Sequence, residues 1–205
     1  MSMEMSEKSR LRGELLDARR LLSVQDVQET AAVLARHALS LPELTRADTV
    51  AAYVSVGKEP GTRALLDALR ARGVRVLLPV LLEDNDLDWG IYRGEDHLER
   101  AGRGLLEPDG ERLGPAAVVT AGAVLLPGLA VDSDGMRLGR GGGSYDRVLA
   151  RLSAAGAHPA LVVLLYANEV VERVPAEPHD HPVHAVVTPG GVSRFTGPTG
   201  PRGGE

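Results

Sequence analysis

The fold is decided by the stretch Thr49-Val-Ala-Ala-Tyr-Val-Ser55 and its counterpart Val74-Arg-Val-Leu-Leu-Pro-Val80. Both are short, mostly apolar runs, which is typical of strands buried on both faces. Between them, Thr62 stands at the expected start of a helix that runs to about Arg72, and Gly73 is a suitable helix end. A strand, a helix and a second strand in this order favour a parallel sheet with a crossover helix.

The region before these strands is helical in pattern. Apolar residues recur three and four apart from about residue 8 to residue 37, with an interruption near Leu22. Ser23 followed by Asp26 resembles a helix N-cap, so two helices are expected there. We expect Pro42 to close the second one.

The region after the two strands continues the alternation. Residues 83–114 are polar and rich in turn residues, which predicts either an antiparallel excursion or a set of functional loops. A further helix is expected over residues 144–154. Further buried strands are expected at 117–120, 123–127, 160–166 and 183–188, the last of these being the final strand.

These elements predict a single α/β layered domain over residues 1–195. Its mostly parallel sheet is flanked by helices in a Rossmann-like way, but no Gly-x-Gly-x-x-Gly fingerprint for a dinucleotide follows an early strand. Residues 196–205 carry no apolar side chain to bury, so a disordered tail is predicted.

Composition narrows the functional classes. The 205 residues have a net charge of -5, which disfavours nucleic-acid binding by bulk charge. There is no Cys, which removes thiolate catalysis and Cys-based zinc sites. Neither a signal peptide nor an apolar run of about 20 residues is found, so we expect a cytoplasmic protein with no membrane contact. We also expect a monomer.

A glycine-rich, basic segment carries the strongest chemical pattern: Arg137-Leu-Gly-Arg-Gly-Gly-Gly-Ser-Tyr-Asp-Arg147. Glycines let backbone N–H groups converge on an anion, and the helix that follows adds its N-terminal dipole. Arg137 and Arg140 add forked donors suited to phosphate. The pattern is no Walker A loop. It predicts a phosphate-binding loop, with a flexible surface linker as the alternative.

Isolated residues elsewhere each have two interpretations. Asp146 can hold a divalent cation beside phosphates, or simply stabilise the dipole of its helix. Lys8 and Arg12, one helical turn apart, can grip phosphate or be solvated surface. Glu59 follows the first strand at the sheet edge where ligand sites collect, or is an exposed loop acid. Trp89 is a stacking platform or a local core anchor.

The stretch His179-Asp180-His181, followed by His184, raises the question of a metal. Mixed Asp and His residues in a loop are a weak pattern for zinc, which favours three or four suitable ligands. Asp180 as a Mg²⁺ ligand is favoured instead, because Mg²⁺ prefers carboxylate, water and phosphate oxygens.

The chain resembles the 5-formyltetrahydrofolate cyclo-ligase family, also called 5,10-methenyltetrahydrofolate synthetases, from about residue 8 to 189. The resemblance is carried mainly by Leu126-Pro-Gly-Leu-Ala-Val-Asp132 and by Asp134-Gly-Met-Arg-Leu-Gly-Arg-Gly-Gly-Gly-Ser-Tyr-Asp-Arg147. Shorter matches support it: Lys8-x-x-Leu11-Arg12, Glu59 with Thr62, Glu107-Pro108, and Asp180-x-Pro182-Val183.

The resemblance implies an ATP-dependent enzyme that converts 5-formyltetrahydrofolate to 5,10-methenyltetrahydrofolate and releases ADP and phosphate, with Mg²⁺ as cofactor. It implies that Arg137, Arg140 and Tyr145 are catalytic. The implied metal ligands are Asp146 and Asp180, and the implied folate contacts are Val54, Glu59 and Trp89. The implied ATP contacts are Lys8, Arg12, Arg137, Gly139, Arg140, Gly141, Gly142, Gly143 and Tyr145.

Three positions depart from the family pattern. Some members have Lys where Gly142 stands, Ser144 replaces the first Tyr of a Tyr-Tyr-Asp, and His184 stands where a second Asp is frequent. Two alternatives therefore stay open: a non-catalytic folate or nucleotide binder, and a sugar-phosphate isomerase on a similar scaffold.

Overall fold

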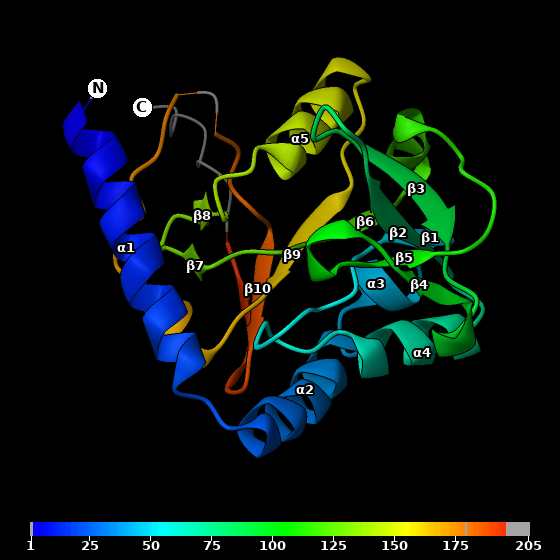
Figure 1. Ribbon diagram of the computed structural model, residues 1–205, viewed down its shortest axis with the longest axis horizontal. Coiled ribbons are helices and arrows are strands. Elements are labelled where there is room, and N and C mark those ends of the chain that lie inside the picture. Colours follow the sequence, from blue (N-terminus) through cyan, green and yellow to red (C-terminus); the bar gives the residue numbers. More distant parts are fainter. Residues whose placement is uncertain (1, 179, 196–205) are drawn as a thin grey trace, which may run out of the picture.

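The computed structural model describes residues 2–178 and 180–195. Its centre is a seven-stranded sheet (Figure 1). In spatial order the strands are β11 (Gly191–Arg194), β10 (Ala185–Thr188), β9 (Ala160–Leu164), β6 (Ala123–Leu126), β1 (Thr49–Ala51), β2 (Arg75–Leu81) and β3 (Leu87–Ile91). The inner strands are parallel, and the two edge strands pair antiparallel with their neighbours. The predicted mostly parallel α/β sheet is confirmed.

Two short ribbons accompany this sheet: β4 (Leu98–Arg100) with β5 (Leu106–Pro108), and β7 (Ala130–Val131) with β8 (Arg137–Leu138). The α-helices are α1 (Ser2–Arg20), α2 (Val24–Ala38), α3 (Pro42–Thr45), α4 (Arg63–Ala71) and α5 (Ser144–Ala154). The 3-10 helices are η1 (Glu95–His97), η2 (Gly102–Gly104), η3 (Pro115–Thr120) and η4 (Ala167–Glu169). The antiparallel excursion expected over residues 83–114 is thus present as β3 and the β4–β5 ribbon.

Helices cover both faces of the sheet (Figure 1). Helices α2, α3 and α4 pack on one face, and α5 with η3 packs on the other. Along β2, Val76 and Leu78 belong to the first of these apolar layers, while Leu77 between them belongs to the second. Because both faces are buried, the inner strands read as continuous apolar runs, which made them recognisable in the sequence.

Helix α1 stands apart from these layers, beside the β7–β8 ribbon (Figure 1). Its residues Leu11, Leu15 and Leu16 pack against Leu129 and Leu138 in a separate small apolar cluster. This packing places the N-terminal helix against the ribbon from which the glycine-rich segment leaves.

The predicted break between the first two helices is confirmed. The Ser23 hydroxyl accepts the N–H of Asp26 at 3.0 Å, and the Asp26 carboxylate accepts the N–H of Ser23 at 3.1 Å. This reciprocal capping box starts α2. Gly73, with φ at +82°, follows the end of α4 as predicted.

Three local predictions were wrong. Helix α2 ends at Ala38, and Pro42 begins α3 instead of closing α2, because proline suits a first helical turn. Residues 117–120 lie in η3, since a short, mostly apolar run does not by itself separate strand from helix. Strand β10 is followed by β11, which pairs only with β10 and has one large apolar residue, Val192.

Thr62 stands at the N-cap position of α4, but its hydroxyl does not cap the helix. The hydroxyl accepts the N–H of Ser55 at 2.9 Å and donates to the carbonyl of Tyr53 at 2.8 Å. Thr62 therefore ties the start of α4 to the chain that leaves β1.

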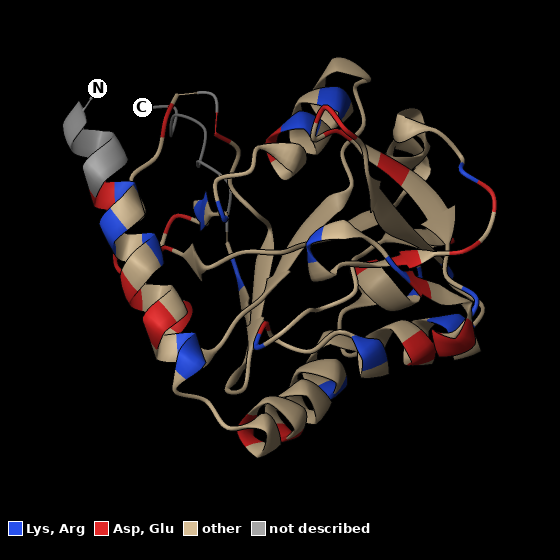
Figure 2. Ribbon diagram, in the orientation of Figure 1, with Lys and Arg blue, Asp and Glu red and all other residues tan. Residues whose placement is uncertain are grey.

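Charged residues lie mainly on the helices and connections, whereas β6, β9 and β10 carry none (Figure 2). Across the part of the chain that the structure describes, each helix is too short or too polar to cross a membrane. The tail predicted over residues 196–205 lies outside the described residues.

Candidate functional site

A pocket of about 370 Å³ opens beside the glycine-rich loop, and we call it the loop pocket. It extends from α1 and residues 139–143 to β2 and the β4–β5 ribbon. All the predicted site residues except Trp89 line it: Lys8, Arg12, Val54, Glu59, Arg137, Gly139, Arg140, Gly141, Gly142, Gly143, Tyr145, Asp146 and Asp180.

The loop between β8 and α5 requires glycine at two positions. Gly141 has φ at +95° and Gly143 has φ at +81°, where a side chain would strain the backbone. Helix α5 begins at Ser144, so its unpaired N–H groups stand at the end of the loop. The arrangement can bind an anion such as phosphate.

The two loop arginines differ in how firmly they are held. Arg137 has a side chain only 8% exposed, donates to the Pro127 carbonyl at 2.8 Å, and lies 3.7 Å from the Asp146 carboxylate. Burial lowers the pKa of Arg137, and the charge of Asp146 opposes this. Arg140 is 54% exposed and lies 3.7 Å from Glu59. Arg137 is thus fixed in place, while Arg140 has room to move onto a ligand.

Helix α1 brings two further cations to the loop. Arg12 Nε donates to the carbonyl of Gly139 at 2.9 Å. Lys8 Nζ lies 4.0 Å from Asp180 Oδ2 and 3.9 Å from Glu177 Oε1. Because Lys8 and Arg12 are one turn apart, both face the pocket. The structure therefore places this pair in the pocket and not on open helix surface.

Glu59 is largely buried at the other side of the loop. Burial raises the pKa of its carboxyl group, while the N–H of Val56, at 3.0 Å from Oε2, and the charge of Arg140 lower it. Burial also raises the pKa of the Tyr145 hydroxyl, and the charge of Glu59 adds to this effect. Groups with perturbed pKa values that meet in one pocket are typical of functional sites.

Comparison with known proteins covers nearly the whole chain. The model of the 5-formyltetrahydrofolate cyclo-ligase family matches residues 4–189. The chain belongs to this family. The 5-formyltetrahydrofolate cyclo-ligase of Mycolicibacterium smegmatis is 42% identical over 187 residues, covering 89% of this chain and 93% of that protein. The Escherichia coli cyclo-ligase is 32% identical, over 85% of this chain and 96% of that protein.

A solved structure leads to the same family. The 5,10-methenyltetrahydrofolate synthetase of Aquifex aeolicus matches with a TM-score of 0.78 and 28% identity, covering 95% of this chain and 96% of that one. The predicted resemblance, the α/β fold and the prediction of a cyclo-ligase enzyme are confirmed. Membership of this family also decides against the sugar-phosphate isomerase.

The acidic residues of the loop pocket fit a Mg²⁺ ion held jointly with phosphate. Asp146 and Asp180 both line the pocket, and the charges of both act on Arg137. Among residues 2–178 and 180–195, no three His, Cys, Asp or Glu side chains form a group that could hold a metal alone. Mg²⁺ is commonly bound by one or two carboxylates with phosphate oxygens and water. Two carboxylates beside a phosphate loop match that requirement and not that of zinc.

The weaker metal candidates lie elsewhere. His179 is outside the described residues. His184 lines a different cavity, where its Nδ1 accepts the N–H of Leu161 at 2.8 Å.

The prediction that Trp89 contacts folate is not supported by the structure. The Trp89 side chain is 0% exposed and lies in the apolar layer beneath α5, with Leu87, Val124 and Val148. Its indole N–H has no hydrogen-bond partner among the described residues. Leu87 lies on the same face of β3 as Trp89 and also lines the loop pocket, whereas Trp89 does not, so the second interpretation, a core anchor, is the one observed.

Several pocket residues were not predicted. Tyr53, Pro79 and Leu81 come from the carboxyl ends of parallel strands, where ligand sites collect, so their positions offered a usable pattern. Arg103 and Leu105 come from the turn of the β4–β5 ribbon, within the segment for which functional loops were one expectation. Nothing in the sequence marked Arg103 individually.

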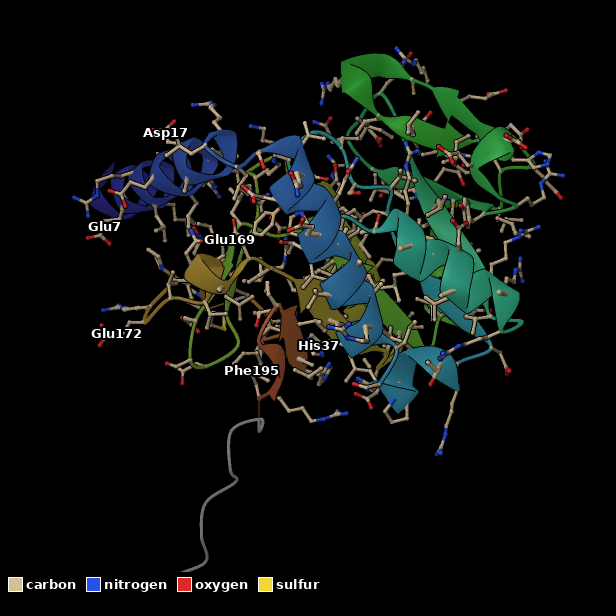
Figure 3. The ribbon with its side chains drawn as sticks, turned by 90° about the horizontal axis from the view of Figure 1, so that it is seen from below. Glu7, Asp17, His37, Glu169, Glu172 and Phe195 are labelled. Atoms are coloured by element: carbon tan, nitrogen blue, oxygen red, sulfur yellow. The ribbon has the colours of Figure 1, made fainter. Side chains whose placement is uncertain are left out.

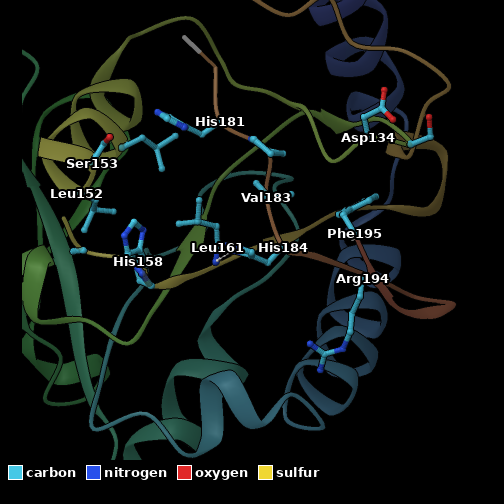
Figure 4. A pocket seen from close by; sticks show the side chains of 15 residues that line it. Asp134, Leu152, Ser153, His158, Leu161, His181, Val183, His184, Arg194 and Phe195 are labelled. Atoms are coloured by element: carbon cyan, nitrogen blue, oxygen red, sulfur yellow. Dashed lines mark hydrogen bonds between the residues drawn. The ribbon is translucent and has the colours of Figure 1, made fainter. Parts of the chain in front are cut away.

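A second, larger cavity of about 710 Å³ lies between the C-terminal half of α5, residues 157–161, and residues 181–184 and 194–195 (Figure 4). It is lined by His158, His181 and His184, but no glycine-rich loop reaches it. We call it the histidine cavity.

Proposed function

We propose that the chain converts 5-formyltetrahydrofolate and ATP to 5,10-methenyltetrahydrofolate, ADP and phosphate in the loop pocket. One observation carries the assignment to this pocket. Lys8 and Arg12, near the start of the chain, and Asp180, near the end of the chain, meet at the glycine-rich loop. The chain in which they meet is a member of the cyclo-ligase family.

The triphosphate of ATP is assigned to the end of the pocket formed by the loop and α1. Backbone N–H groups of residues 139–143 and the first turn of α5 supply fixed dipoles. Arg137 and Arg140 supply forked donors, and Lys8 and Arg12 add charge from the facing helix. Asp146 and Asp180 would hold Mg²⁺, which supplies positive charge to the phosphate oxygens when bound.

The reduced folate is assigned to the side of the pocket formed by Val54, Glu59 and the β4–β5 ribbon. Val54 and Tyr53 are buried and apolar at the strand end, and Leu105 adds an apolar wall. Glu59, with its raised pKa, provides a polar group for the heterocycle. An apolar wall with a few placed polar groups is typical of sites for flat heterocyclic ligands.

The formyl oxygen is a poor leaving group, so the reaction has to activate it first. The formyl oxygen attacks the γ-phosphorus and displaces ADP. N10 then forms a bond to the formyl carbon and loses its proton, and phosphate carries away the oxygen. The protein's task is to align the two substrates and to neutralise charge on the transferred group. We assign Arg137, Arg140 and Tyr145 to contact the transferred phosphoryl group, because they lie together at the loop.

The test is to mix purified protein with Mg-ATP and 5-formyltetrahydrofolate and to follow the absorbance of the methenyl product. Product should form only when ATP is present, and removal of Mg²⁺ with a chelator should stop it. A folded protein that binds both ligands without product would establish the non-catalytic binder instead. The expected cytoplasmic location and monomeric state stay predictions, and gel filtration checks the second.

A further inference from the structure

Helix α1 carries a buried charge that is not part of the pocket wall. Arg19 is 5% exposed, and its guanidinium donates to Glu169 Oε2 at 2.7 Å and to Oε1 at 3.0 Å. Glu169 itself is 0% exposed. Figure 3 shows Glu169 on the segment against α1, whereas Glu7 and Asp17 of that helix are exposed. Two parallel bonds between an arginine and a carboxylate fix direction as well as distance.

This ion pair reaches the chain that holds Arg137. Arg19 also donates to the carbonyl of Gly128 at 2.8 Å. The neighbouring carbonyl, that of Pro127, accepts Arg137 at 2.8 Å. The carbonyls of Pro127 and Gly128, which directly follow β6, therefore accept hydrogen bonds from two arginines. Pro127 accepts from Arg137 in the pocket wall, and Gly128 accepts from the buried Arg19.

The same ion pair reaches the loop that carries Glu59. Glu169 Oε1 accepts the N–H of Tyr166 at 2.9 Å, and the Arg19 guanidinium lies 5.7 Å from the centre of the Tyr166 ring. The Tyr166 hydroxyl donates to the carbonyl of Lys58 at 2.9 Å. Lys58 precedes Glu59, and its ammonium group donates to the carbonyl of Arg20 at 2.7 Å. The end of α1, η4 and the Glu59 loop thus form one connected network.

The position of Arg19 on α1 determines what this network controls. Lys8, Arg12, Leu15 and Arg19 are four, three and four residues apart, so they form one stripe along the helix. The apolar contacts of α1 are non-directional, so they define rotation and sliding of the helix less sharply than a forked ion pair does. Anchoring Arg19 fixes both, about 10 Å from Arg12 along the axis.

Resting on the proposed function, we propose that Arg19 and Glu169 are positioning residues for ATP. Their ion pair holds α1 in the rotation and register at which Lys8 and Arg12 meet the glycine-rich loop. Buried ion pairs contribute little net stability compared with apolar replacements, and fixing one geometry among several is their better established role. The pair touches no substrate and acts through Arg12 and Lys8.

The test measures steady-state kinetics of Arg19→Met, which removes the charge and keeps a long apolar side chain. The KM for ATP should rise about tenfold, as for loss of one charge-assisted contact. The KM for 5-formyltetrahydrofolate and kcat should each change less than about threefold. Leu44→Ala is the matched control: Leu44 is 0% exposed on α3, so the variant loses stability without disturbing α1. Its KM for ATP should stay unchanged.

A double-mutant cycle separates positioning from general destabilisation. In an Arg12→Ala background, Arg19→Met should raise the KM for ATP by less than about threefold, because one of the two groups through which it acts is gone. Arg19→Lys should recover part of the loss, since one ammonium group cannot make both bonds. Equal effects of Arg19→Met with and without Arg12, or equal effects of Arg19→Met and Leu44→Ala, would overturn the proposal.

Two further measurements keep the outcome clear. If Arg19→Met does not fold, Glu169→Gln preserves the shape of the partner and should raise the KM for ATP several-fold, and an unchanged KM would overturn the proposal. If the unaltered chain shows no turnover, the proposed function fails by itself. Calorimetric binding of Mg-ATP to the same variants then tests the positioning role, with the same order of affinities expected.

Discussion

The loop pocket and the histidine cavity differ in the bonding of their charged side chains as well as in volume. The histidine cavity is about twice as large, 710 against 370 Å³, but two of its polar side chains, Arg194 and His184, are bonded within the protein. Arg194 forms a forked ion pair with Glu43, and His184 accepts a backbone N–H. In the loop pocket Lys8, Arg137 and Arg140 lie 3.7 to 4.0 Å from carboxylate oxygens, too far for strong bonds to those groups.

This difference indicates that converging positive charges mark a candidate phosphate site better than size does. A cation in a long ion pair loses little interaction energy when it moves to a ligand. Arg194 would lose two hydrogen bonds to Glu43 if it did so.

The largest effect is expected from Arg137→Ala. The variant loses a buried donor that is already in position for phosphate, so kcat/KM for ATP should fall about 100-fold. Arg194→Ala, which removes the arginine of the histidine cavity, should leave kcat/KM within about twofold. Similar losses in the two variants would remove the distinction between the cavities, as measured by initial rates across an ATP titration.

The next effect concerns the metal. Asp146→Asn should raise the Mg²⁺ concentration that gives half-maximal activity roughly tenfold, because a neutral amide is a weaker ligand for Mg²⁺. Asp134→Asn, in the wall of the histidine cavity, serves as the comparison and should leave the Mg²⁺ titration unchanged. An unchanged titration for Asp146→Asn would leave that residue only its stabilising role in the first turn of α5.

Two glutamates with opposite pKa shifts give a comparison in stability. Burial raises the pKa of Glu59 above its ordinary 4.5, so its favourable contribution is complete below pH 4.5 and lost as pH rises through the raised value. The hydrogen bonds of Arg194 lower the pKa of Glu43, so its contribution is present above pH 4.5 and lost as pH falls.

Melting temperatures of Glu59→Gln and Glu43→Gln, each measured against the unaltered chain, check these signs. Between pH 4 and pH 7, Glu59→Gln should gain stability relative to the unaltered chain, and Glu43→Gln should lose it. Glu59→Gln should also raise the KM for the folate roughly tenfold, whereas Glu43→Gln should not. The same sign for both variants would contradict the burial of Glu59.

The smallest effect is expected from Trp89→Phe. Phenylalanine keeps part of the apolar contacts and removes an indole N–H without a partner among the described residues, but it leaves a small cavity, so stability should fall by about 1 to 2 kcal/mol. The KM for 5-formyltetrahydrofolate should stay within twofold, as expected of a side chain in neither cavity wall. A tenfold rise in this KM would instead support the prediction that Trp89 contacts the folate.

The sequence predicted the fold well where strands are buried on both faces. The apolar runs that became β1, β2, β6 and β9 are marked by composition alone, because a parallel sheet covered by helices excludes polar residues. It failed at η3 and β11. The former has the composition of a buried strand, and the latter, Gly191–Arg194, is an edge strand whose pairing with β10 is not written in its own residues.

The features of the candidate site also divide into those that the sequence predicts and those that it does not. Backbone conformation and charge are local properties, so the sequence by itself determined that Gly141 and Gly143 permit a tight loop and that arginines accompany it. Only the tertiary structure decided that α1 lies against that loop, with Arg12 bonded to Gly139, 127 positions away. The same packing turned Trp89 into the core and held Arg19 against Glu169. Contacts between distant segments depend on how whole layers pack, and no single stretch of sequence specifies them.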